Sequence, residues 1–290
     1  MTSDNEARRR RLAGRLSVGT GASSVVDNDR APSEHVLDAT SMAAFYDSVS
    51  DALDATPMGE WSRFLNYGYA DSSDDRTVVE LPPGTMDRAS VKLVLELVGD
   101  VDLDGGRILD VGSGRGGTVA TVLDHYAPRS VIGIELSRTA VAFCRRSVLD
   151  ARATFVVGDA QRLPVAAESV DFVTNVESAH CYPEVRRFHA EVRRVLAPGG
   201  VFLYTDILPT ASLTWRMDHL RSLGFALEVE RNITRQVLLA CDRIASRRQE
   251  SFDSASDEVL RDFLAVEGSP TYEAMANGSS TYVIWRFRRS

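Results

Sequence analysis

The stretch NVESAHCYP, residues 175–183, places several reactive side chains close together in the sequence. It contains a carboxylate, an imidazole, a thiol and a phenol, which belong to Glu177, His180, Cys181 and Tyr182. It follows the apolar run VDFVT, residues 170–174, whose length and β-branched content are typical of a buried strand. Ligands of open parallel sheets bind beyond the carboxyl ends of the strands, so this position indicates a functional site.

A glycine-rich loop follows another apolar run. In ILDVGSGRGG, Gly112, Gly114 and Gly117 have G-x-G-x-x-G spacing and lie between a predicted strand and a predicted helix. Glycines in that context allow a tight turn and the close approach of a ligand to the backbone. The helix N-terminus adds free N–H groups and a positive dipole end. The loop therefore predicts a nucleotide-like ligand.

Three acidic residues at predicted strand ends indicate which nucleotide binds. Glu135, twenty-one residues after Gly114, can accept hydrogen bonds from both ribose hydroxyls of a nucleoside. Asp110 would repel a pyrophosphate but can orient an ammonium group, which S-adenosylmethionine has and NAD lacks. Asp159, in GDAQRLP, can accept from the exocyclic amine of an adenine. Together these residues favour S-adenosylmethionine over a dinucleotide.

Short β-branched runs alternate with helical patterns along the chain. Strands are predicted at residues 107–111, 130–134, 154–157, 169–175, 200–206 and 281–288. Helices are predicted at residues 86–98, 118–126, 138–149, 184–195, 214–223 and 234–263. The alternation predicts an α/β fold: a doubly wound, mostly parallel, seven-stranded Rossmann-like sheet with an N-terminal helical lid.

Composition excludes several classes of protein. The chain has 290 residues, 44% hydrophobic content and a net charge of -8, which is typical of a soluble globular protein and disfavours a nucleic-acid partner. Its three cysteines give neither a disulfide framework nor a metal motif, and no Asp, Glu and His set indicates a metal site. No apolar run is long enough to span a membrane. We therefore expect a cytoplasmic protein.

Three regions are expected along the chain. Residues 1–33 are predicted to form a mobile arm, residues 34–85 a helical and aromatic lid, and residues 86–290 a Rossmann-like core with acceptor-binding C-terminal insertions. The basic start of the arm and the aromatic surface of the lid are compatible with a homo-oligomer.

Several motifs occur in the order typical of one enzyme family. LDVGSGRGG, IELS, GDAQRLP, NVES and RVLAPGGVFLYTD resemble the successive motifs of class I S-adenosylmethionine-dependent methyltransferases, over roughly residues 86–210. NVESAHCYP and RFHAEVRRVLAPGG are most similar to the natural-product group that includes phthiotriol and phenolphthiotriol dimycocerosate methyltransferases. The likeness to macrolide and indolocarbazole sugar O-methyltransferases is looser. The tail beyond about residue 210 matches poorly and is expected to help set acceptor specificity.

The resemblance implies a set of cofactor contacts. Tyr67 lies in FLNYGY, which resembles the segment that closes over the cofactor in that group. The methionine end would be lined by Asp110, Gly112, Ser113 and Gly114, the ribose by Glu135 and Leu136, and the adenine by Asp159, Ala160 and Gln161. Asn175 and Glu177 would lie beside the sulfonium.

His180 is the predicted general base, because an imidazole titrates near neutral pH and can take a proton from an acceptor hydroxyl. Asp206 ends the next predicted strand, twenty-six residues later, and could fix the tautomer of His180 and stabilise its imidazolium. The alternative is that His180 only bonds a backbone carbonyl and packs against the acceptor. A Cys181 nucleophile is disfavoured, since methyl transfer from a sulfonium needs no covalent intermediate.

The expected reaction is methylation of a lipophilic small molecule, a secondary metabolite, at an oxygen atom. One alternative is methylation of an alkene carbon in a terpenoid, where aromatic rings would stabilise a carbocation and His180 or Glu177 would quench it, with possible cyclisation. Another is an enzyme that retains the cofactor and guides a cyclisation without methyl transfer. The sequence neither identifies the acceptor nor separates these alternatives.

Overall fold

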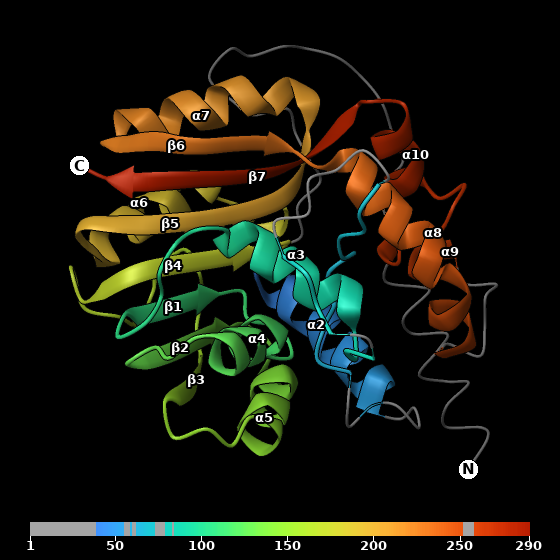
Figure 1. The fold of residues 1–290 in the computed structure, drawn as a ribbon, viewed down its shortest axis with the longest axis horizontal. Coiled ribbons are helices and arrows are strands. Elements are labelled where there is room, and N and C mark those ends of the chain that lie inside the picture. The colour runs from blue at the N-terminus through green and yellow to red at the C-terminus, as the bar shows by residue number, and fades with distance from the viewer. Residues whose placement is uncertain (1–38, 55–58, 60–61, 73–78, 83, 252–257) are drawn as a thin grey trace.

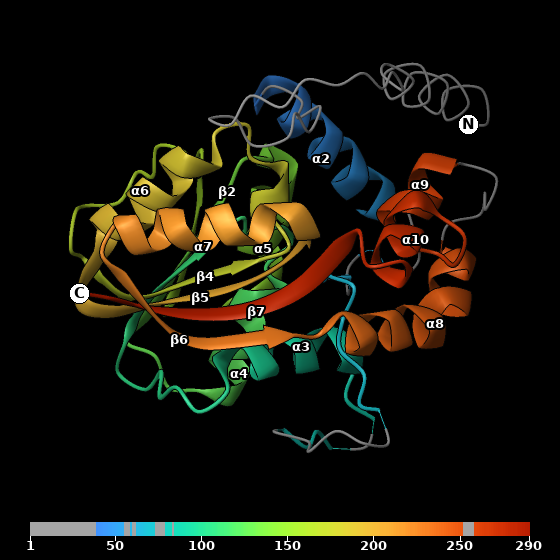
Figure 2. The same ribbon diagram turned by 90° about the horizontal axis from the view of Figure 1, so that it is seen from above.

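The computed structural model describes residues 39–54, 59, 62–72, 79–82, 84–251 and 258–290. The predicted N-terminal arm, residues 1–33, lies outside the described residues. The described part of the chain forms a seven-stranded sheet with helices on both faces (Figures 1 and 2). The predicted doubly wound, Rossmann-like α/β fold is therefore confirmed.

The sheet is parallel except for one strand. The strands are β1 Arg107–Val111, β2 Ser130–Glu135, β3 Ala153–Val157, β4 Val170–Val176, β5 Leu196–Pro209, β6 Phe225–Asn232 and β7 Ser280–Arg289. Their order is β3-β2-β1-β4-β5-β7-β6, and β7 pairs antiparallel with both β5 and β6. The strands from β1 to β5 run in one direction, so their carboxyl ends meet at the same edge of the sheet.

Helices cover both faces of the sheet (Figure 2). One face carries α3 Arg88–Val98, α4 Gly117–His125 and α5 Arg138–Ser147, and the other carries α6 Val185–Val195 and α7 Leu213–Ser222. The sequence of α6 explains its position, because Val185, Phe188, Val192 and Val195 recur on one side of the helix and are all buried.

The helix α5, which follows β2, is fixed at its start. Ser137 is the N-cap of α5, and its Oγ accepts a hydrogen bond from the backbone N–H of Ala140 at 3.1 Å. The same hydroxyl donates to Asp47 Oδ1 at 2.5 Å. Asp47 belongs to α2 Ala39–Asp54, so this contact ties α2 to the core beside Glu135.

Three further helices follow β6 in the chain: α8 Thr234–Ser251, α9 Glu258–Phe263 and α10 Pro270–Ala276. They gather on the same side of the molecule, beyond the ends of β6 and β7, and α9 lies near α2 (Figures 1 and 2). Across the described residues, we find no helix that combines the length and the apolar character needed to cross a membrane.

The prediction differs from the structure mainly in the tail. The strand β6 was not predicted, although FALEVERN alternates apolar and polar residues, because an edge strand with one covered face gives a weak signal. The predicted helix over residues 234–263 is two helices, α8 and α9, with residues 252–257 outside the described part. The short helix α10 was also not predicted; it has a Ser269 cap and Pro270 in its first turn, which are typical start signals.

Candidate active site

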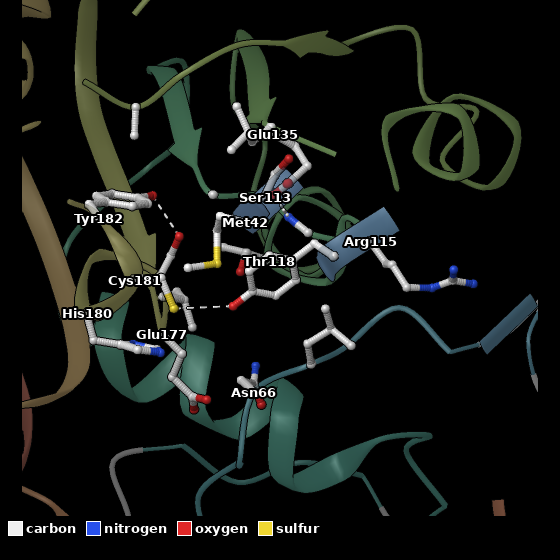
Figure 3. Close-up of a pocket in the computed structure, with 18 of the residues that line it drawn as sticks. Met42, Asn66, Ser113, Arg115, Thr118, Glu135, Glu177, His180, Cys181 and Tyr182 are labelled. Carbon is white, nitrogen blue, oxygen red and sulfur yellow. Dashed lines mark hydrogen bonds between the residues drawn. The ribbon is translucent and has the colours of Figure 1, made fainter. Parts of the chain in front are cut away.

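A cavity of about 330 Å³ opens at the carboxyl edge of the sheet (Figure 3). Its inner side is formed by the ends of β1, β2, β3 and β4, and its outer side by α2 and residues 63–67. The predicted site residues on its wall are Tyr67, Gly112, Ser113, Gly114, Glu135, Leu136, Asp159, Ala160, Gln161, Glu177 and His180. Its volume is within the range of small-molecule sites.

The turn after β1 requires glycine. Gly112 has φ +73°, and a Cβ at this position would lie 1.9 Å from Ser178 Oγ and 2.8 Å from the hydroxyl of Tyr182. These two hydroxyls are themselves hydrogen-bonded at 2.6 Å. A side chain at position 112 would therefore push the residues after β4 away from the cofactor loop.

Glu135 ends β2 and turns its carboxylate toward the same loop. Its Oε2 accepts the N–H of Gly114 at 2.9 Å, and its Oε1 accepts the N–H of Ser137 at 2.8 Å. Burial raises the pKa of Glu135, while the backbone donors act in the opposite direction. Each carboxylate oxygen can accept a further hydrogen bond, so Glu135 still offers acceptors to a ribose.

The loop after β3 is held by its own side chains. Asp159 Oδ1 accepts the backbone N–H of Gln161 at 2.8 Å and its Nε2 at 3.1 Å. The Oε1 of Gln161 in turn accepts the N–H of Glu184 at 2.8 Å, just ahead of α6. With Ala160 and Leu136 beside them, these residues form a pre-organised wall at the ends of β2 and β3.

Two predicted cofactor residues lie behind the wall rather than on it. Asp110 is buried in β1, where its Oδ1 accepts the hydroxyl of Thr174 at 2.7 Å. Asn175 is buried in β4, where its Nδ2 donates to the carbonyl of Val111 at 2.8 Å. The register of β1 and β4 places Asp110 beside Thr174, so the side chains of Asp110 and Asn175 point to opposite faces of the sheet. Neither residue lines the cavity, and their contact with the cofactor stays a prediction.

The donor and acceptor set fits S-adenosylmethionine. Asp110 Oδ2 and Ser113 Oγ are buried and have no hydrogen-bond partner among the described residues. A ligand with an ammonium and a carboxylate group would supply partners for both kinds of atom. Burial raises the pKa of Asp110 to about 7, and a neighbouring cation would favour its charged form.

The predicted pair at the reactive end is formed. His180 Nδ1 lies 2.6 Å from Asp206 Oδ1, and the backbone N–H of His180 donates to Asp206 Oδ2 at 2.9 Å. The hydroxyl of Tyr204 also donates to Oδ2, at 3.2 Å. Asp206 is fully buried in β5, whereas the His180 side chain is 30% exposed. Burial lowers the pKa of His180, but Cys181 and Asp206 beside it outweigh burial and raise it well above 6.5.

Glu177 follows β4 directly and lines the cavity beside His180 (Figure 3). Its Oε1 accepts the N–H of Tyr67 at 2.8 Å and the hydroxyl of Tyr282. Its φ of +46° is a left-handed conformation that costs a residue with a side chain of order 1 kcal/mol or more. Burial raises the pKa of Glu177 to about 7. The carboxyl group can therefore exchange a proton near neutral pH.

Arg115 fixes the outer side of the cavity, although the sequence analysis gave it no role. Its side chain is fully buried and points away from the cavity centre (Figure 3). The guanidinium donates to acceptors on residues 50–62: the carbonyls of Ser50, Gly59 and Ser62, the hydroxyl of Ser50 and the carboxylate of Asp54. Arg115, the residue after Gly114 in the glycine loop, thus holds α2 in place.

Further lining residues were missed because they come from distant parts of the chain. Tyr46 of α2 places its hydroxyl 3.4 Å from Cys181 Sγ. Phe263 of α9 lines the cavity near Phe45. Tyr282 of β7 does not line the cavity, but its hydroxyl donates to Glu177 across 105 sequence positions. Local sequence patterns do not predict contacts between segments that are far apart in the chain. The aromatic character of residues 45–69 indicated only that this segment covers the site.

The fold and the site together define a Rossmann-like enzyme with a nucleoside-binding edge. Comparison with known proteins identifies the family. A family profile described as "Methyltransferase domain" matches residues 109–204. The chain is 32% identical to the fatty-acid O-methyltransferase of Mycolicibacterium smegmatis over 227 residues, which is 77% of this chain and 82% of that protein. The chain therefore belongs to the class I S-adenosylmethionine-dependent methyltransferases.

A second group of relatives matches over a similar length. The phthiotriol/phenolphthiotriol dimycocerosates methyltransferase of Mycobacterium tuberculosis is 31% identical over 234 residues, which is 78% of this chain and 85% of that protein. This confirms the resemblance found in the sequence motifs, and the match of the chain to methyltransferases confirms S-adenosylmethionine as the cofactor.

Solved structures with the same fold cover most of the chain. The cyclase SpnF aligns with a TM-score of 0.66 and 21% identity, over 87% of this chain and 96% of that chain. Geranyl diphosphate methyltransferase aligns with a TM-score of 0.64 and 18% identity, over 87% and 99%. The cyclopropane synthase MmaA2 from Mycobacterium tuberculosis has a TM-score of 0.65 at 16% identity, over 89% and 100%. These similarities establish the fold alone.

Proposed function

We propose that this methyltransferase methylates an oxygen atom of a lipophilic small molecule, with His180 as the general base. The observation that carries the proposal is the buried Asp206 carboxylate bonded to His180 at the reactive end of the cavity. With Nδ1 engaged by Asp206, Nε2 is the ring nitrogen that takes the proton of an acceptor hydroxyl.

The lining of the cavity supports a lipophilic acceptor. Apolar and aromatic side chains supply much of its outer wall: Met42, Phe45, Tyr46, Phe64, Leu65 and Phe263. The names of the two relatives also refer to lipids, a fatty acid and dimycocerosates. We include in the proposal that residues 34–85 act as a lid and that the C-terminal helices help to bind the acceptor.

Each residue of the site has a defined task in this proposal. When bound, S-adenosylmethionine supplies a methyl group carried on a positively charged sulfur. Glu135 holds the ribose, and Asp159 with Gln161 holds the adenine. Asp206 keeps His180 oriented and stabilises the imidazolium formed when it takes a proton. The segment around Tyr67 covers the site and excludes water, which strengthens these electrostatic interactions.

A carboxyl oxygen is the second candidate acceptor, and the raised pKa of His180 favours it. Asp206 and Cys181 raise the pKa of His180 well above 6.5, so they favour the protonated, positively charged form of its ring. An imidazolium binds an ionised carboxylate directly, and such an acceptor needs no base because it has already lost its proton.

Carbon methylation is the alternative within the same class. Glu177, with a pKa of about 7, can take a proton from a carbocation at neutral pH, and the rings of Tyr46 and Tyr67 can stabilise the cation. A cofactor-retaining cyclase would use the same pocket without consuming the cofactor.

The test is incubation with methyl-labelled S-adenosylmethionine and one of three acceptors: a long-chain phenol, a fatty acid or an isoprenoid alkene. Mass spectrometry and NMR locate the label. Oxygen methylation is supported if the label appears in a methyl ether or a methyl ester and if His180→Gln strongly lowers the amount of that product. A carbon-bound methyl would contradict it, and acceptor conversion without formation of S-adenosylhomocysteine would favour the cyclase.

A further inference from the structure

A continuous row of aromatic side chains forms a wall that connects α9 and α2 to the candidate base. The rings of Phe263 and Phe45 meet edge to face with centroids 5.9 Å apart, and the rings of Phe45 and Tyr46 meet in the same way at 5.3 Å. The Tyr46 hydroxyl then contacts Cys181 Sγ at 3.4 Å, next in sequence to His180. All five residues line the cavity. The wall therefore joins α2 and α9 to the reactive end.

The charged side chains near this wall are already engaged. Asp262 Oδ1, next to Phe263, accepts the N–H of Thr271 at 2.6 Å. Arg63 donates to the carbonyl of Ser147 at 2.8 Å, and Arg115 is bonded to residues 50–62. Among the described residues that line the cavity, His180 is the remaining basic side chain. The wall thus suits the uncharged apolar part of an acceptor, and one basic side chain, His180, lies at its inner end.

We propose that this wall is the acceptor subsite: it binds an elongated, uncharged apolar chain that ends in one oxygen function at His180, and the Phe45–Phe263 ring pair limits the length of that chain. The inference rests on the proposed function and names the substrate class for the same site. A diphosphate-bearing isoprenoid is excluded as the preferred acceptor, because its charge would lack partners along the wall.

The ring pair is suited to limit chain length because its two members come from separate elements. Phe45 lies on α2 and Phe263 on α9, and both rings are only partly buried. Neither ring belongs to the two large hydrophobic clusters of the core. Replacing either ring by a smaller side chain therefore opens the rim without removing a residue of the main core.

The probes are para-butylphenol, para-octylphenol and para-dodecylphenol, with geranyl diphosphate as the charged comparison. Binding is measured by calorimetry on the full chain saturated with S-adenosylhomocysteine, and methylation is measured separately with S-adenosylmethionine. In the unmodified protein, affinity should rise about fourfold for each added methylene until the chain reaches the ring pair, and then stop rising. Phe45→Ala and Phe263→Ala should move this limit to longer chains.

Two sets of control variants keep the test specific. Phe45→Leu and Phe263→Leu retain a bulky apolar side chain and should keep the original limit even if the alanine variants fold poorly. Phe64→Leu changes a ring that packs on Gly117 of the cofactor loop. It should weaken binding of S-adenosylhomocysteine and leave the chain-length profile unchanged.

Failure of the subsite and failure of the proposed function give different results. The subsite is overturned if affinity does not depend on chain length, if the alanine variants keep the original profile, or if geranyl diphosphate binds more tightly than para-octylphenol. Alkylphenols that bind with the expected profile but are never methylated would support the subsite and contradict methylation of a hydroxyl oxygen.

Discussion

Asp206 accepts two hydrogen bonds from one residue, His180: from the backbone N–H at 2.9 Å and from ring Nδ1 at 2.6 Å. The first bond fixes the main chain of the turn after β4, and the second fixes the imidazole plane. The two strand ends are therefore locked together at the point where an acceptor oxygen would be activated.

Replacing Asp206 by asparagine should lower kcat by roughly 100-fold, because an amide neither stabilises an imidazolium nor enforces the same tautomer. Affinity for S-adenosylhomocysteine should stay within about twofold of the unmodified value, since Asp206 is not on the cavity wall. Steady-state kinetics and calorimetry measure the two quantities. The control is Asp171→Asn, at the opposite end of β4, which should leave kcat unchanged. An unchanged kcat in Asp206→Asn would argue against the dyad.

The pH dependence should identify the acceptor class. His180 has a raised pKa and faces Asp206, Cys181 and Glu177. With a hydroxyl acceptor, activity needs the neutral ring, so kcat/KM should fall as pH drops through that raised pKa. With a carboxylate acceptor, activity needs the charged ring, so kcat/KM should fall as pH rises through it. For either acceptor class, Asp206→Asn should shift the midpoint of the pH dependence of kcat/KM to lower pH, because it removes the negative charge that raises the pKa of His180. A profile that is flat above pH 6 and unaffected by this substitution would contradict both roles.

Glu135→Ala should weaken binding of S-adenosylmethionine and S-adenosylhomocysteine by a similar factor, roughly 10- to 100-fold, because both share the ribose. Titration calorimetry gives the two dissociation constants. Glu228→Ala removes a carboxylate on β6, away from the cavity, and should change neither constant. If Glu135→Ala bound both ligands normally, the ribose contact would have to be assigned elsewhere.

Gly112→Ala should lower the free energy of unfolding in two ways, through backbone strain and through a steric collision. Comparison with Gly199→Ala separates the two contributions. Both glycines have positive φ, +73° and +76°, so each substitution should cost about 1–2 kcal/mol of stability. Only at position 112 does the new Cβ meet Ser178 Oγ, which should add about 1–3 kcal/mol. Urea unfolding measures both free energies. If the two variants lost the same free energy of unfolding, the collision with Ser178 would contribute nothing to the destabilisation.

Arg115→Met should destabilise the protein by roughly 3–5 kcal/mol, because it leaves buried acceptors of residues 50–62 without their donor. Arg146 binds the same carboxylate, Asp54, from a side chain that is 54% exposed, so Arg146→Met should cost less than about 1 kcal/mol. Dissociation of S-adenosylhomocysteine, followed by stopped flow, should become faster only in Arg115→Met. Similar behaviour of the two variants would mean that Arg115 does not hold α2.

The parallel part of the fold could be predicted because each of its strands carries a local signal. Residues 107–111 and 130–134 are apolar, β-branched and followed by a turn, and they match β1 and β2 closely. The same logic placed His180 near Asp206, since the ends of neighbouring parallel strands must meet. β6 was missed because it is an edge strand with alternating exposure.

Contacts between distant segments could not be predicted in this way. The bond between Tyr282 and Glu177 depends on β7 inserting beside β5, and the bonds of Arg115 depend on how α2 crosses the cofactor loop. The sequence also indicated Asp110 and Asn175 as cofactor contacts; both side chains are buried and bonded to the neighbouring strand, and neither lines the cavity. Side-chain direction at a strand end depends on where the turn begins, and residue spacing alone does not specify it.

The position of β7 sets the order in which the protein can be completed during synthesis. β7 is made after β6 yet lies between β6 and β5, so β6 has no neighbour in the sheet when it leaves the ribosome. Glu177, made more than a hundred residues earlier, obtains its Tyr282 partner only when β7 is inserted. A nascent chain that ends before Ser280 therefore lacks both the strand that joins β6 to β5 and the hydroxyl that bonds Glu177.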